Sequence, residues 1–161
     1  MSALYSSPLE RTRETAAAIS GRVGKAVVVE RGLVECDFGT WTGEALSRLR
    51  KLPEWQAVQR WPSGFRFPGG ESFLELQSRL TDAVERICRA HPGEVVVAVS
   101  HADCIKAVLA SALGVPLDLF QRIVVSPCSI STVVYGSDGP AVLAMGSPGL
   151  PPGLPSPEAS R

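Results

Sequence analysis

The chain has 161 residues, enough for one domain with a single hydrophobic core and too few for two ordinary ones. Hydrophobic residues make up 45% and charged residues 20%, a balance typical of a soluble globular protein. Basic and acidic residues are equal at 16 each, so no bulk charge favours nucleic acid or a membrane surface as a partner. Any anion that binds must therefore be held by a few placed groups.

The cysteines and the N-terminal segment predict a reducing cytoplasm. Cys88, Cys104 and Cys128 have apolar neighbours and are predicted to be core residues, whereas Cys36 lies in a loop-like stretch. No C-x-x-C pair or zinc-ligand spacing occurs, so we expect no metal and no cofactor. Residues 1–8 hold neither a basic region nor a long apolar run, and no signal peptide is predicted.

The first part of the chain is predicted to form a strand, a helix, a second strand and an ordered loop. Residues 3–5 are extended, and apolar residues at helical spacing predict a helix over roughly 9–22. The β-branched run 26–29 predicts a strand. Residues 33–43 are expected to be a loop with short extended pieces, followed by a helical tendency over 44–61 that is interrupted at Pro53.

The second part begins with a loop over 62–70 and continues into the clearest helix. Its apolar stripe runs from Phe73 to Ile87, and polar residues such as Arg79 are expected to face away. The run Val95–Val99 is typical of a strand buried on both faces. A helix over 103–113 and strands over 123–125, 130–135 and 142–145 follow. Residues 147–161 predict a disordered Pro/Gly-rich tail, which leaves 1–146 as a single domain.

Strands that alternate with helices predict the α/β class, with a mainly parallel sheet flanked by helices. Ligands of such sheets bind beyond the carboxyl ends of the strands, where helix N-termini favour anions. Arg11 falls in the first turn of its helix and His101 directly follows the 95–99 strand, so both are candidates for that position. Glu35, in a glycine-bounded loop, is a candidate general acid.

Each of these residues also has a simpler interpretation. Arg11 and Glu35 could be solvated surface side chains, and His101 could be a helix cap. Asp37 and Trp41 share the Glu35 loop and are candidates for lining a pocket, although core packing explains the tryptophan equally well. His91 is assigned to a polar turn that ends a helix.

Four segments in consistent order resemble motifs of the histidine phosphatase superfamily, the phosphoglycerate-mutase-like proteins. Residues 7–16 resemble its S-x-L-x-R-A/T-x-x-T-A signature, and residues 33–43 resemble its L-x-E-x-x-x-G-x-W-x-G loop. Residues 67–72 resemble its P-G-G-E-S segment, and residues 97–102 resemble its strand ending in S/T-H-G/A. One such motif alone would be weak, but four in order are specific.

The resemblance implies a three-layer phosphoglycerate-mutase-like fold and phosphoryl transfer through a phosphohistidine. Arg11 would clamp the phosphoryl oxygens, His101 and the adjoining Ala102 would bind them, and Glu35 would protonate the leaving oxygen and then activate water. Asp37, Trp41 and Arg66 are candidates for the substrate pocket. The Glu35 loop resembles that of the small bacterial phosphatases of the superfamily more than that of the mutases. We expect a small phosphorylated metabolite as the substrate, and a homodimer is a candidate assembly.

The sequence departs from the family at the nucleophile, which the family carries in an R-H-G motif after its first strand. Neither histidine follows an arginine here, since His91 follows Ala90 and His101 follows Ser100. We therefore expect the family's N-terminal strand and nucleophile to lie outside this chain, through a late-assigned start or a truncation. The strand over 95–99 should then have an unpaired apolar edge.

Three functions remain open at this point. The first is a phosphomonoesterase of the histidine phosphatase type, complete only with the R-H-G segment. The second is a non-catalytic protein that binds anions or a partner, and the third is a phosphoglycerate mutase.

Overall fold

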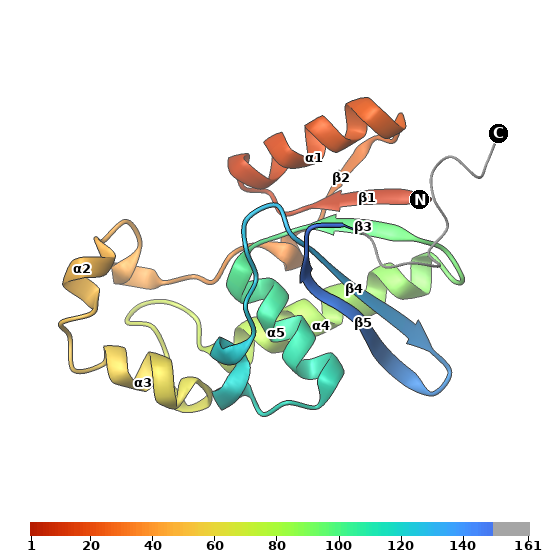
Figure 1. The fold of residues 1–161 in the computed structure, drawn as a ribbon. Coiled ribbons are helices and arrows are strands. Elements are labelled where there is room, and N and C mark those ends of the chain that lie inside the picture. The colour runs from red at the N-terminus through yellow and green to blue at the C-terminus, as the bar shows by residue number, and fades with distance from the viewer. Residues whose placement is uncertain (150–161) are drawn as a thin grey trace.

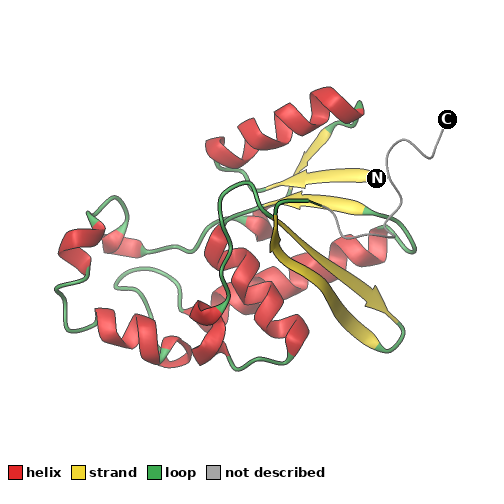
Figure 2. Cartoon of the chain, viewed as in Figure 1, coloured by secondary structure: helices red, strands yellow, loops and turns green. Residues whose placement is uncertain are grey.

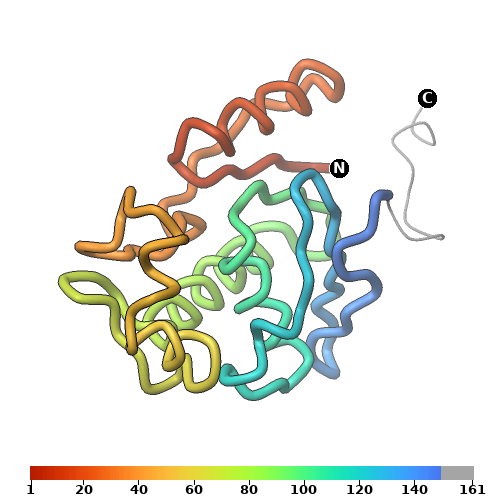
Figure 3. The backbone as a smooth tube through the Cα atoms, turned by 60° about the vertical axis from the view of Figure 1, so that its left-hand side comes forward, coloured from red at the N-terminus to blue at the C-terminus, as the bar shows by residue number. Residues whose placement is uncertain are grey.

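The computed structural model describes residues 1–149 and has three layers. A parallel sheet in the order β2-β1-β3 lies in the middle. Its strands are β1 (Ala3–Ser6), β2 (Val27–Val29) and β3 (Val96–Val99). Helix α1 (Glu10–Val23) covers one face, and α4 (Phe73–Ala90) and α5 (Ala102–Leu113) cover the other (Figure 1). Figure 3 shows the same arrangement, with the orange-red α1 on one side of β1 and the green helices on the other.

The remaining elements are shorter. Two helices, α2 (Leu46–Leu49) and α3 (Trp55–Arg60), come after β2 and before α4 in chain order. The strands β4 (Ile130–Gly136) and β5 (Gly139–Ser147) form an antiparallel hairpin that is separate from the parallel sheet and contacts α5 (Figure 2). Strand β5 ends one residue beyond the predicted domain boundary. Residues 150–161, most of the predicted tail, lie outside the described residues.

Local sequence signals fix the ends of the main helices. Ser72 accepts the backbone N–H of Glu75, and the Glu75 carboxylate accepts the backbone N–H of Ser72, so α4 begins with a capping box. Helices α1 and α5 end at Gly24 and Gly114, which have φ values of 66° and 65°. Glycine adopts this left-handed conformation without the penalty of a Cβ atom, so both helices stop where the sequence predicts.

The core lies between the sheet and the α4–α5 layer. Tyr5 and Val96 pack against it from the sheet, while the neighbouring Leu4 is fully buried and points to the opposite face. The rings of Phe65, Phe67, Phe73 and Phe120 make successive edge contacts. This aromatic row joins the loop before α4 to the segment after α5.

Two strand predictions are corrected. The run Val95–Val99 is not buried on both faces, because Ala98 is exposed and the valines are only half-buried. No strand forms over 123–125, because these residues leave a 3₁₀ helix at 117–122 and have no neighbouring strand to pair with. Val124 remains 76% exposed.

The cysteine assignments also change. Cys36 is buried, since its loop packs on the core through Leu33, Cys36 and Trp41. Cys128 is exposed, in a turn before the hairpin with a φ of 59°. Apolar neighbours in sequence therefore predicted the buried Cys104 correctly, but not the half-buried Cys88 or the exposed Cys128.

The predicted unpaired edge of the 95–99 strand is present. On one side β3 pairs with β1, from Ala3 opposite Val96 to Ser6 opposite Val99. On its other side it pairs with no strand of residues 1–149. Within the same residues, no helix combines the length and the apolar character that crossing a membrane requires.

Candidate active site

Two parallel strands bring the candidate residues together. The carboxyl ends of β1 and β3 lie at one edge of the sheet, and each leads within a few residues into a helix N-terminus. The chain passes from β1 through Ser7 into α1, and from β3 through His101 into α5. The N–H of Ser7 donates to the carbonyl of Val99 over 2.9 Å, which fixes the two exits side by side.

Arg11, Glu35 and His101 converge at this edge. Arg11 Nη2 and His101 Nδ1 each lie 3.6 Å from Glu35 Oε2. The Arg11 side chain is largely exposed, Glu35 is partly buried and His101 is almost fully buried. Ala102 begins α5 beside them, so its backbone N–H belongs to a helix N-terminus. The structure thus places these four residues together, as the sequence predicts.

The surroundings of Glu35 favour the protonated form of its carboxyl group. Its burial raises its pKa above the ordinary value, and the charge of Asp103 adds to this, while the Cys36 N–H and the Arg11 guanidinium oppose it. Glu35 Oε1 accepts the N–H of Cys36 over 3.0 Å. A carboxyl with a raised pKa is suited to donating a proton near neutral pH.

His101 is held neutral. Burial, followed by the charges of Arg11 and Arg79, lowers the pKa of its imidazole to about 4. Its contact with Glu35 is therefore that of a neutral ring beside a carboxyl at neutral pH. Such a ring can donate one hydrogen bond and accept another.

Arg79 and Glu71 hold the Glu35 loop in place. Arg79 Nη1 donates to the carbonyls of Gly32 and Val34 over 2.9 and 3.0 Å, and its Nη2 lies 2.6 Å from Glu71 Oε1. Glu71 Oε1 also accepts the N–H of Asp37 over 2.9 Å. The prediction that Arg79 faces away from the core side is therefore wrong: it turns inward because the loop's carbonyls need a donor.

The same loop packs backbone against backbone on the segment before α4. A Cβ atom on Gly39 would lie 2.2 Å from the Pro68 carbonyl oxygen, and one on Gly70 would lie 2.1 Å from the Asp37 oxygen. Both positions thus require glycine. Asp37 itself is exposed and accepts the N–H of Gly39 over 2.9 Å, so its side chain closes a turn here.

Trp41 both packs in the core and lines a pocket, whereas Arg66 makes its contacts at the start of α4. Trp41 is buried against Trp55, Phe65 and Phe67, and it lines a pocket of about 280 Å³ with residues that include Arg48 and Leu52. Arg66 pairs with Glu75 and donates to the Gly70 carbonyl, which reinforces the start of α4.

Ser7 is the residue of this site that the sequence did not single out. Its hydroxyl lies 2.8 Å from His101 Nε2, and both side chains are buried. Ser7 opens the first of the four motifs, so its presence was visible, but its contact with a residue 94 positions away was not. Glu71 was likewise visible within the P-G-G-E-S segment without a role.

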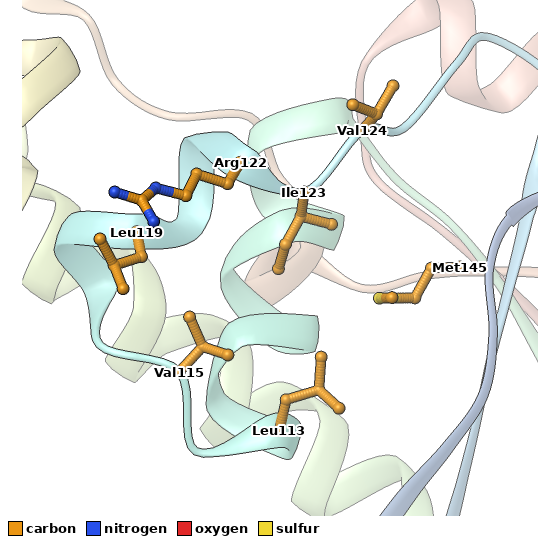
Figure 4. Close-up of a pocket in the computed structure, with 7 residues that line it drawn as sticks. All are labelled: Leu113, Val115, Leu119, Arg122, Ile123, Val124 and Met145. Atoms are coloured by element: carbon orange, nitrogen blue, oxygen red, sulfur yellow. The ribbon is translucent and has the colours of Figure 1, made fainter.

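A larger pocket, of about 440 Å³, lies at the other end of α5 (Figure 4). Its lining is apolar apart from Arg122, and includes Leu113 at the helix C-terminus and Met145 of β5. His101 occupies the N-cap position at the opposite end of the same helix, about 18 Å away at 1.5 Å per residue, but its side chain makes no capping hydrogen bond there. Among residues 1–149, no three His, Cys, Asp or Glu side chains are grouped closely enough to hold a metal ion.

Comparison with known proteins assigns the family. The model of the histidine phosphatase superfamily, branch 1, matches residues 1–148. Phosphoserine phosphatase 1 of Hydrogenobacter thermophilus is 35% identical over 121 residues, which cover 73% of this chain and 56% of that protein. A probable phosphoglycerate mutase of Klebsiella pneumoniae is 33% identical over 135 residues, covering 82% of this chain and 62% of that protein.

The fold agrees with these relatives. The structure of YhfR from Bacillus stearothermophilus superposes with a TM-score of 0.85 at 25% identity, covering 91% of this chain and 74% of that one. The chain spans less than two thirds of the length of the curated relatives it matches. Sequence, fold and the convergence of Arg11, Glu35 and His101 agree, and the chain belongs to branch 1 of the histidine phosphatase superfamily.

Proposed function

We propose that this chain carries most of the active site of a phosphomonoesterase that acts on a small phosphorylated metabolite. The observation that carries the proposal is the meeting of Arg11, Glu35 and His101 at the carboxyl edge of the sheet, next to two helix N-termini. This arrangement combines a guanidinium fork, a neutral donor and a carboxyl with a raised pKa. Phosphoryl transfer depends mostly on such positioning and charge stabilisation.

The proposed reaction has two steps. A histidine from an R-H-G segment outside this chain attacks phosphorus, the P–O bond of the ester breaks as a P–N bond forms, and Glu35 gives its proton to the leaving oxygen. Glu35 then takes a proton from water as the water oxygen attacks phosphorus and the P–N bond breaks. The net change consumes one water and releases the alcohol and phosphate. In both steps Arg11 and His101 hold the phosphoryl oxygens.

The relatives support this class of substrate. One is named for phosphoserine phosphatase activity and another for phosphoglycerate mutase activity, and both names describe small phosphorylated metabolites. Arg66 pairs with Glu75 and Arg79 with Glu71, whereas Arg11 lies beside Glu35, so we assign Arg11 as the cation that holds the phosphoryl group.

The absence of an Arg-His pair in the sequence favours a second candidate, a protein that binds anions without turnover. Hydrolysis of p-nitrophenyl phosphate by the 161-residue chain separates the two. We expect no turnover by this chain, and turnover by a version extended with the in-frame upstream sequence if that sequence contains Arg-His-Gly. Turnover by the unextended chain would refute the assignment of the nucleophile to another segment, and an in-frame stop directly upstream would favour binding alone.

Phosphate binding tests the site without the nucleophile. By calorimetry, Arg11→Met is expected to weaken binding of inorganic phosphate by about tenfold or more, since a charged hydrogen bond contributes about 1.5–3 kcal/mol. Arg13→Met, which removes an exposed arginine from the same helix, is the matched control and should bind as the unchanged chain does. Equal affinities for the two variants would contradict the role of Arg11. A requirement of the extended enzyme for a bisphosphorylated primer would instead identify a mutase.

A further inference from the structure

The two nitrogens of the His101 ring face different partners. Nε2 lies 2.8 Å from the Ser7 hydroxyl oxygen, and Nδ1 lies 3.6 Å from Glu35 Oε2. A neutral imidazole carries one proton, so one nitrogen donates and the other accepts. The nitrogen that carries the proton decides whether His101 donates or accepts a hydrogen bond on the side where a ligand would bind.

Both partners favour a proton on Nδ1. In the unliganded site Glu35 pairs with Arg11 as a carboxylate, whose oxygens only accept hydrogen bonds, so the histidine nitrogen that faces it is best protonated. The Ser7 oxygen already receives the N–H of Leu9, over 3.4 Å, and its own proton is free to point at Nε2. With the proton on Nδ1, the Ser7 hydroxyl donates to Nε2 and each group has a complementary partner.

We propose that Ser7 is a positioning residue that holds His101 as the Nδ1–H tautomer, with that N–H directed to the side where Glu35 and Arg11 lie. The backbone keeps the pair in register, because the Ser7 N–H is bonded to Val99 at the end of β3. Thr12 adds to this, since its hydroxyl is shared between the carbonyls of Ser7 and Leu9, at 3.0 and 2.7 Å. The serine is therefore fixed on two sides.

Ser7, His101 and Glu35 also resemble the order of groups in a serine hydrolase triad, but Ser7 does not fit the nucleophile's role. Its side chain is fully buried, so no substrate atom can reach the hydroxyl while α1 keeps its place. Ser7 acts through His101, and its effect on catalysis rests on the proposed function. The tautomer itself does not.

The tautomer can be read directly in this chain. The sequence has only two histidines, so a long-range ¹⁵N–¹H spectrum of the histidine-labelled protein holds two sets of ring signals, with His91 as internal reference. At pH 7 His101 is neutral, since burial and the nearby arginines keep its pKa near 4. We expect its Nδ1 to give the signal of a protonated nitrogen and its Nε2 that of an unprotonated one.

The variants then isolate the serine hydroxyl. Ser7→Ala is expected to shift His101 towards the Nε2–H form, which free imidazole side chains prefer, and Ser7→Thr should restore the original pattern. Ser6→Ala is the matched control, because Ser6 is equally buried but its hydroxyl donates to the Ser7 carbonyl and not to His101. His91 signals should be the same in all variants.

Two results would overturn the proposal: an Nε2–H tautomer in the unchanged chain, or a Ser7→Ala spectrum identical to it. The spectra are recorded without phosphate, so they do not depend on the proposed function. In the phosphate titration, Ser7→Ala should bind about tenfold more weakly if the Nδ1–H contacts the anion. Failure of the unchanged chain to bind phosphate would count against the proposed function and leave the tautomer result standing.

Discussion

Glu71 Oε1 and Arg79 Nη2 lie 2.6 Å apart, and this pair joins α4 to the backbone of the loop that presents Glu35. Both side chains are mostly shielded from solvent, at 16% and 26% exposure. The pair therefore does more than a surface ion pair, since the loop carbonyls and N–H that it binds would otherwise be unsatisfied.

The first prediction concerns the ion pair of Glu71 and Arg79. Arg79→Met keeps most of the side-chain volume but removes the donors, and we expect the free energy of unfolding to fall by about 2 kcal/mol. Urea denaturation measures it. Arg48→Met removes an exposed arginine that pairs with Glu44 over 2.9 Å, and should change stability little. A similar loss of unfolding free energy in both variants would contradict a role of Arg79 in holding the Glu35 loop.

The second prediction uses the raised pKa of Glu35. The folded protein holds this proton more tightly than the unfolded chain, so stability falls as pH rises from 4.5 through the folded pKa. Glu35→Gln removes that cost and should raise the melting temperature at pH 8 but not at pH 4. Stability and activity should thus change in opposite directions at this residue.

Glu75 serves as a control for Glu35, because its pKa is shifted in the opposite direction. Its contacts with Arg66 and the start of α4 lower the pKa of its carboxyl to about 2, so its contribution is present above pH 4.5 and is lost as pH falls towards 2. Glu75→Gln should lower the melting temperature at pH 8. A lower melting temperature for Glu35→Gln at that pH would contradict the cost that we assign to burying the charged Glu35 carboxylate.

The third prediction concerns acid stability. The unfolded chain protonates His101 near pH 6.5, whereas the folded protein resists this until about pH 4, so stability is lost as pH falls through that window. His101→Asn should be spared this loss. Between pH 7 and pH 4, the free energy of unfolding of the unchanged chain should fall relative to the variant by up to about 3 kcal/mol, as urea titrations at several pH values would show. If the unfolding free energies of the two proteins changed with pH in parallel, His101 would not be the source of the acid sensitivity.

The fourth prediction concerns thiol reactivity. Burial raises the pKa of Cys36 strongly and that of Cys104 to about 12, so neither should react with a thiol reagent at pH 8. Cys128 is exposed and should react quickly, with half-buried Cys88 slower. Cys128→Ser should remove the fast phase, and denaturant should make the buried thiols accessible. A fast reaction of Cys36 would show that the Glu35 loop does not pack as described.

Sequence patterns predicted the sheet, the main helices and four residues of the site, because β-branched runs, helix ends and short motifs are local signals. Ser7 and Arg79 escaped this reasoning, since their roles depend on partners far away in sequence. The 123–125 strand failed for a related reason: β-branched residues favour extended backbone, but a strand also needs a neighbour to pair with. Both interpretations hold for Trp41, which packs against Trp55 and Phe67 and also lines a pocket.

The adjacency of β1 and β3 also governs the order in which this protein can fold. Ser7 and His101 are 94 positions apart, so the first strand leaves the ribosome long before the strand that completes its pairing is made. Closing so large a loop carries an entropic cost before any contact is gained, which slows folding. During synthesis β1 can pair with β2 before β3 is made, and the residues of the site meet only when β3 and α5 join them.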